Sequence, residues 1–128
     1  MKKVLFILIC LLMLTGCTEE PKEETKKVAP VNKITCQDVN KLVSEEGAIV
    51  VDVRTSEEYD IDHLENAINI NSETIKYTIK GKIKDYDTPI IVYCQSGRRS
   101  AQSAIELVNL GYTKVYDMGS ITSCYGEE

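Results

Sequence analysis

The sequence predicts an α/β fold with a central, mainly parallel sheet of about five strands and helices on both of its faces. Short runs of β-branched apolar residues alternate along the chain with stretches of helical periodicity, and this alternation is typical of α/β proteins. The run 48–53 is almost entirely apolar, which indicates a strand covered on both faces, as in a parallel sheet. A length of 128 residues leaves room for one such domain.

The first sixteen residues have the pattern of an export signal. Two lysines precede an apolar run, Val4–Leu14, which is too short to span a bilayer. The run leads into LTGC at positions 14–17, which resembles the bacterial lipobox, where the chain is cut before the cysteine and the cysteine is lipidated. We therefore expect a lipoprotein signal peptide at 1–16 and a lipid anchor at Cys17, on the extracytoplasmic face of the cell membrane. An ordinary signal peptide with a chance cysteine is the alternative.

Residues 17–33 are expected to form the lipidated cysteine and a flexible tether, and residues 34–128 the folded domain. The tether carries many charges and two prolines and lacks apolar periodicity, as solvated linkers do. Loss of residues 1–16 would change the net charge from −5 to −7, because it removes two lysines and no acidic residue. Such an acidic domain is a poor match for nucleic acid, so we expect no nucleic-acid partner. We also expect a monomer.

Helices and strands alternate through the expected domain. Thr35, with an acidic residue three positions later, begins a helix that ends at Gly47. A weaker helical pattern after the third strand is expected to break at Gly81. The last strand is expected at 113–118, and a short closing helix at 121–125.

Several charged residues follow the strand 48–53. Asp52 and Arg54 are expected to form a buried structural pair at its end. Glu58 lies in a helix that follows an N-cap signal, and we expect it to complement the helix dipole. His63 is expected to be a structural residue, because no nucleophile lies near it in the sequence. A third strand is expected at 67–70.

The chain is organised around the unit 89–111, in which an apolar strand runs into an amphipathic helix. Residues 90–93 are β-branched or aromatic, and Gly111 closes the helix as a C-terminal glycine. The polar loop between strand and helix consists of Cys94, Gln95, Ser96, Gly97, Arg98 and Arg99.

Cys94 is the candidate nucleophile of this loop. A cysteine at the tip of a strand, facing the first turn of a helix, meets unpaired backbone N–H groups and the positive end of the dipole. The two arginines add positive charge, and all of these features favour thiolate over thiol. The alternative is that Cys94 is a small core hydrophobe, but its surroundings in the sequence are polar and cationic.

From about Ile34 to Gly126 the chain resembles a single-domain rhodanese. The likeness is carried by the segments 49–54 and 57–59, by 63–64 with 67–70, by 91–101, and by 111–119. The resemblance implies a rhodanese-like domain and a sulfurtransferase in which Cys94 carries the transferred sulfur as a persulfide, with the loop 95–99 binding the substrate. The donor would be a small sulfur anion such as thiosulfate or a persulfide. The acceptor would be a thiol, a partner protein or cyanide, and the chemistry needs no cofactor.

Three rival functions remain open. Related phosphatases and arsenate reductases use a Cys-x5-Arg loop, whereas Cys94 and Arg99 are separated by four residues, so the shorter loop favours sulfur over phosphate. The domain could instead be a persulfide-carrying module that passes sulfur to an envelope partner. It could also be a thiol–disulfide protein of the envelope, since exported proteins meet oxidising conditions.

Three cysteines remain for the folded domain, because Cys10 lies in the expected signal peptide and Cys17 is the expected lipid site. The resemblance implies that the ends of the domain meet, so we predict a structural disulfide between Cys36 and Cys124 with Cys94 free. A Cys94–Cys124 link is the alternative. The chain has no C-x-x-C pair and one histidine, so we expect no metal site.

Overall fold

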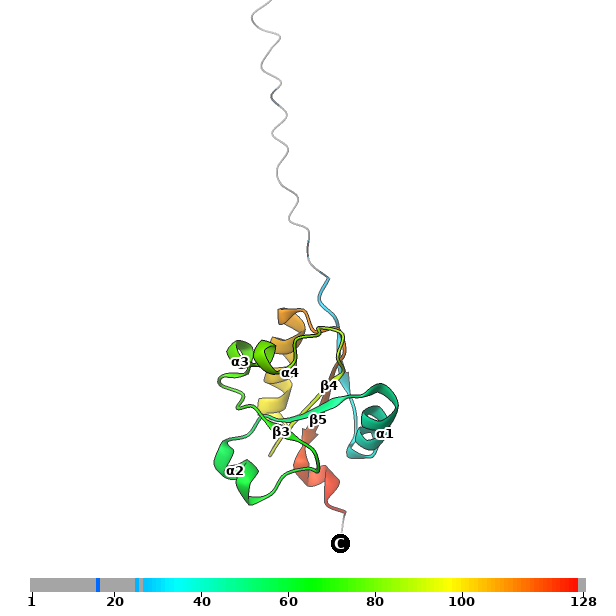
Figure 1. Cartoon of the computed structure of the whole chain (residues 1–128), viewed down its shortest axis with the longest axis vertical. Coiled ribbons are helices and arrows are strands. Elements are labelled where there is room, and N and C mark those ends of the chain that lie inside the picture. The colour runs from blue at the N-terminus through cyan, green and yellow to red at the C-terminus, as the bar shows by residue number, and fades with distance from the viewer. Residues whose placement is uncertain (1–15, 17–24, 26, 127–128) are drawn as a thin grey trace, which may run out of the picture.

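A five-stranded parallel sheet forms the centre of the protein in the computed structural model, which describes residues 16, 25 and 27–126 (Figure 1). Its strands lie in the order β1-β5-β4-β2-β3. They are β1 (Val31–Lys33), β2 (Ile49–Asp52), β3 (Ile68–Asn69), β4 (Ile90–Cys94) and β5 (Val115–Ser120). The helices are α1 (Cys36–Glu46), α2 (Ser56–Ile61), α3 (Ile75–Lys82), α4 (Arg98–Leu110) and the 3-10 helix η1 (Ile121–Cys124). The predicted α/β class and the single domain are confirmed.

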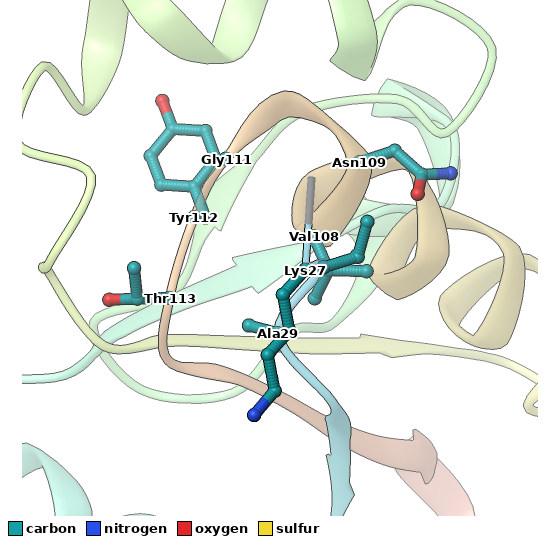
Figure 2. A pocket seen from close by; sticks show the side chains of 8 residues that line it. Lys27, Ala29, Val108, Asn109, Gly111, Tyr112 and Thr113 are labelled. Carbon is teal, nitrogen blue, oxygen red and sulfur yellow. The ribbon is translucent and has the colours of Figure 1, made fainter. Parts of the chain in front are cut away.

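The sheet begins earlier in the chain than the sequence analysis expects. β1 lies in the segment assigned to the tether, yet it pairs in parallel with β5, and Lys33 forms an ion pair with the buried carboxylate of Asp117. Upstream of β1, residues 27–29 and the C-terminal end of α4 line a small pocket of about 190 Å³ (Figure 2). This edge strand is defined by its backbone pairing with β5. Edge strands often carry charged side chains such as Lys33, so its sequence shows no apolar periodicity that would predict a strand.

Cys17 and residues 1–15 of the expected signal peptide lie outside the described residues. Among the helices that the structure does describe, none combines the length and the apolar composition needed to cross a bilayer.

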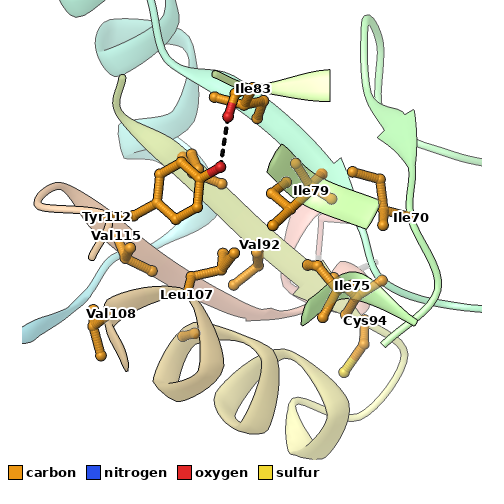
Figure 3. Close-up of a cluster of buried hydrophobic side chains, with 14 residues drawn as sticks. Ile70, Ile75, Ile79, Ile83, Val92, Cys94, Leu107, Val108, Tyr112 and Val115 are labelled. Carbon is orange, nitrogen blue, oxygen red and sulfur yellow. Dashed lines mark hydrogen bonds between the residues drawn. The ribbon is translucent and has the colours of Figure 1, made fainter. Parts of the chain in front are cut away.

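The two faces of the sheet carry separate apolar clusters because side chains alternate along each strand. In β4, Ile90, Val92 and Cys94 face the cluster that contains the inner faces of α3 and α4 (Figure 3). Ile91 and Tyr93 belong to the cluster on the opposite face, which includes residues of α1 and η1. All five side chains are fully buried, so the strand that ends in Cys94 is the most enclosed part of the sheet.

Helix α3 continues through Gly81 to Lys82, so the expected break at this glycine is wrong. Its inner residues Ile75 and Ile79 are fully buried, and this packing outweighs the helix-propensity penalty of about 1 kcal/mol for glycine. The carbonyl of Ile83, which follows the helix, accepts a hydrogen bond of 2.5 Å from the buried hydroxyl of Tyr112 (Figure 3). This bond joins the end of α3 to the segment between α4 and β5.

A disulfide joins Cys36, the first residue of α1, to Cys124, the last residue of η1. The two residues are 88 positions apart in the sequence, and their Cα atoms are 5.3 Å apart. They meet because α1 and η1 pack on the same face of the sheet, around a shared apolar cluster. The pairing is the one that the resemblance implies, and Cys94 is left as a free cysteine.

Reduction of the Cys36–Cys124 disulfide is expected to lower the free energy of unfolding by about 2–5 kcal/mol, because the link restricts the unfolded chain. Urea denaturation of the full-length protein, with and without reductant, measures the difference. The Cys36→Ser/Cys124→Ser double variant is the control, since its unfolding midpoint should not respond to reductant. An unchanged midpoint in the reduced wild type would contradict the prediction.

Candidate active site

The sulfur of Cys94 faces the first turn of α4. Its Sγ accepts hydrogen bonds from the backbone N–H groups of Gly97, at 3.0 Å, and Ser100, at 3.4 Å. N–H groups at the start of a helix have no acceptor within the helix, and the helix dipole adds positive potential at this end. The junction of β4 and α4 therefore holds the sulfur where negative charge on it is stabilised.

Cys94 is fully buried beneath its loop. Gln95, Ser96 and Arg98 are exposed, whereas the strand side of Cys94 is packed against the apolar cluster that contains Ile75 (Figure 3). A donor must therefore approach from the loop side.

Gly97 gives the loop its sharp bend. Its φ of +93° lies in the left-handed region, which side chains other than glycine rarely adopt. A Cβ at this position would lie 3.7 Å from the Cα of Gly119, so β5 closely backs the loop. The hydroxyl of Ser100 donates to the Gly97 carbonyl at 3.1 Å and fixes the bend from the helix side.

Arg99 braces the loop against α2. Its guanidinium donates two hydrogen bonds to the carboxylate of Glu58, at 2.7 and 2.9 Å. These bonds are the main reason that the pKa of Glu58 falls from its ordinary value of 4.5 to about 2, and they raise the pKa of Arg99. From the sequence, Glu58 is expected only to complement the helix dipole. Its link to Arg99 joins residues 41 positions apart, and no local pattern indicates it.

Asp52 and Arg54 form the buried pair that the sequence analysis expects. The Arg54 guanidinium donates to both carboxylate oxygens of Asp52, at 2.7 to 3.0 Å, and these bonds raise the pKa of Arg54. Arg54 also donates to the side-chain oxygen of Gln95, at 3.3 Å, and to the carbonyl of Asp62, at 2.5 Å. The pair thus connects the end of β2 with the Cys94 loop.

Ser120 and His63 differ in their relation to the loop. The sequence gives no indication of a role at the site for Ser120, the last residue of β5, yet its hydroxyl donates to the carbonyl of Gln95. His63 lies on the surface, with its ring stacked on Tyr59 at a centroid distance of 3.7 Å and its Nδ1 2.7 Å from the Tyr59 carbonyl. These contacts fit the structural role expected for His63, and they keep its ring on the α2 segment.

Arg98 is the cation that the loop presents to solvent. It is exposed, and among the described residues it forms no ion pair.

Among the described residues, no three His, Cys, Asp or Glu residues gather in a way that could hold a metal ion. The pocket of Figure 2 lies at the other end of α4, roughly 20 Å along the helix axis from the loop, and it is separate from this site.

The fold and the loop together define a class of protein: a parallel α/β domain with a free cysteine between a strand and the N-terminus of a helix. Residues 35–123 match the family model of the rhodanese-like domain. The chain belongs to this family, and with it to the rhodanese-like sulfurtransferases.

Curated relatives and solved structures agree with this assignment. Thiosulfate sulfurtransferase PspE of Escherichia coli (strain K12) is 37% identical over 71 residues, which cover 56% of this chain and 68% of that protein. A rhodanese with anions from E. coli superposes with a TM-score of 0.58 at 34% identity, over 59% of this chain and 89% of that one. A tRNA uridine(34) hydroxylase of Wigglesworthia glossinidia brevipalpis is 34% identical over 88 residues, which cover 66% of this chain but 28% of that protein. The family therefore includes relatives of more than one activity.

Replacement of Glu58 by glutamine is expected to destabilise the protein by about 1 kcal/mol at neutral pH, because Arg99 loses a charged partner that is partly screened by solvent. The pKa of Glu58 is depressed in the folded protein, so its contribution is fully present above pH 4.5 and is lost as the pH falls towards 2. Urea denaturation at a series of pH values measures the difference between variant and wild type. The difference should shrink across this window, and Asp60→Asn, on the same helix, should show no comparable loss. A difference that stays constant down to pH 2 would contradict the prediction.

Proposed function

We propose that this protein is a rhodanese-type sulfurtransferase that moves a sulfane sulfur from thiosulfate or a persulfide donor to a thiol acceptor through a persulfide on Cys94. The observation that carries the proposal is the pair of N–H groups, from Gly97 and Ser100, that point at the Cys94 sulfur from the start of α4. The name of the PspE relative, a thiosulfate sulfurtransferase, supports sulfur as the transferred group.

The reaction proceeds in two displacements at sulfur. The Cys94 thiolate attacks the outer sulfur of thiosulfate, a new S–S bond forms, and sulfite leaves with the electron pair of the bond that breaks. The thiolate of the acceptor then attacks the outer sulfur of the persulfide, and Cys94 leaves as a thiolate. Cyanide can replace the thiol in an assay, with thiocyanate as the product. Every electron pair is accounted for by the donor, Cys94 and the acceptor, so neither step needs a metal or an organic cofactor.

The charges around the loop suit an anionic donor and an anionic intermediate. The whole chain has a net charge of −5, so a small sulfur anion needs a local attraction to reach the loop. Arg98 supplies it, because Arg99 is engaged by Glu58 and Arg54 by Asp52. Once the persulfide has formed, the N–H groups at the start of α4 stabilise its negative charge without reorganisation.

The structure bears on the rival functions in different ways. Cys124 is bonded to Cys36, so Cys94 lacks a cysteine partner among the described residues, which disfavours thiol–disulfide exchange. The loop from Cys94 to Arg99 is shorter than a Cys-x5-Arg phosphate loop, which disfavours phosphatase chemistry. The full burial of Cys94 favours one variant of the sulfur hypothesis, a module that holds its persulfide for a particular acceptor and turns over slowly with small molecules.

The Cys94→Ser variant tests the proposed function. Wild-type full-length protein treated with thiosulfate should gain the mass of one sulfur atom on Cys94, and it should release thiocyanate when cyanide is added. The variant should do neither, because a serine hydroxyl cannot form a persulfide. A phosphatase assay of the same two proteins is the control for the rival reaction. Absence of sulfur on Cys94 in the wild type, or equal activity of the two proteins, would reject the proposal.

We propose in addition that Cys17 carries lipid and anchors the protein in the cell membrane, with the domain on the extracytoplasmic side. The support is the LTGC sequence at 14–17 and the apolar run before it. More than one acyl chain holds a protein stably on a bilayer, whereas a single chain binds marginally. In a bacterial host, the wild type should incorporate labelled fatty acid and fractionate with membranes, and Cys17→Ala should incorporate none. Equal labelling of the two proteins would refute the anchor.

A further inference from the structure

Ser120 lies directly behind the Cys94 loop. It is the last residue of β5, and it pairs with Cys94 in the parallel register of β4 and β5. Its hydroxyl donates to the carbonyl of Gln95. The same hydroxyl accepts from the backbone N–H of Thr122, at 3.2 Å, and lies 2.6 Å from the hydroxyl of Thr122.

The hydrogen bonds of Ser120 form a consistent set. A serine hydroxyl has one proton to donate and two lone pairs that accept. Because its proton goes to the Gln95 carbonyl, the Thr122 hydroxyl must donate to Ser120, and the Thr122 N–H supplies the second accepted bond. The hydroxyl of Ser120 is therefore saturated and has one orientation, which lets it hold the Gln95 carbonyl in place.

The position of this carbonyl decides where the next N–H group points. The peptide bonds of the described residues are trans, and in a trans peptide the C=O and the following N–H point in opposite directions. The Gln95 carbonyl points towards Ser120 of β5, so the Ser96 N–H points away from β5. Among the described residues this N–H has no acceptor, whereas those of Gly97 and Ser100 already donate to the Cys94 sulfur.

We propose that Ser120 is a positioning residue that fixes the Gln95–Ser96 peptide so that the Ser96 N–H donates to the outer sulfur of the Cys94 persulfide. The assignment rests on the proposed function and adds a donor that the resting cysteine leaves unused. The two N–H groups bound to Sγ stabilise the inner sulfur, and the Ser96 N–H is free for the second one. A hydrogen bond to the Gln95 carbonyl also polarises the peptide, which strengthens its N–H as a donor.

The kinetic effect should appear in the chemical step. The outer sulfur meets the Ser96 N–H as the persulfide forms, so loss of its orientation raises the barrier more than it weakens donor binding. Ser120→Ala should lower kcat by about tenfold, less than the 10²–10³ that accompanies complete removal of an oxyanion donor, because the N–H group remains but is no longer held. KM for thiosulfate should change by less than about twofold.

The matched variants are Ser120→Thr and Ser123→Ala, made in the full-length protein. Ser120 has φ −80° and ψ 133°, a conformation that threonine adopts readily, so the hydroxyl is retained and wild-type kcat should return. Ser123 lies in the 3-10 helix η1 that follows Ser120, and its hydroxyl donates to the Ser120 carbonyl at 2.8 Å rather than to the loop. Its loss should leave kcat unchanged.

A second readout follows the Ser96 amide proton by NMR. Loading Cys94 with sulfur should move this resonance downfield in the wild type and in Ser120→Thr, and should leave it in place in Ser120→Ala. If the wild type gains no sulfur, the proposed function itself fails. If the wild type is loaded but Ser120→Ala keeps its kcat and its shift, or if Ser123→Ala loses as much activity, the function stands and the role of Ser120 is refuted.

Discussion

The site depends on the contact between the Cys94 sulfur and the backbone N–H groups at the start of α4. A helix leaves its first N–H groups without internal acceptors, and this chain directs two of them at a cysteine sulfur. The contact needs β4 to end at Cys94, a sharp bend at Gly97 and a helix that begins immediately afterwards. The three requirements are met within the five consecutive residues from Cys94 to Arg98, so the local sequence determines the geometry of this contact.

The shape of the loop, by contrast, is maintained from three other elements. Arg99 is paired with Glu58 of α2, Gln95 accepts through its side chain from Arg54 beside β2, and its carbonyl accepts from Ser120 of β5. The carboxyl ends of parallel strands meet at one edge of the sheet, which brings these partners to the loop. A loop braced from several directions keeps its N–H groups aimed at one point, and donors held in this way stabilise charge without reorganisation.

Burial and charge support the proposed use of a small anionic donor. The Cys94 side chain is enclosed on the strand side by the apolar cluster of α3 and α4, so reagents meet it through the loop alone. The domain is acidic, yet the loop presents Arg98 as a free cation among the described residues. Cys36 and Cys124 are joined in a disulfide, so among the described residues Cys94 is the cysteine whose thiol is free to react. An exposed loop cation near a buried sulfur is consistent with the small anionic donor that we propose.

The sequence by itself determined the α/β class, the parallel sheet and the unit that holds Cys94, because apolar periodicity and the junction of strand and helix are local properties of the chain. It also indicated the Asp52–Arg54 pair, whose members are two residues apart. Tertiary structure decided what local patterns do not encode. β1 is defined by backbone pairing with β5, α3 passes Gly81 because packing outweighs propensity, and Glu58 and Ser120 reach the loop from positions 41 and 25 residues away. Side chains that meet only after folding leave no periodic signal, so the bracing of the loop became visible only in the folded chain.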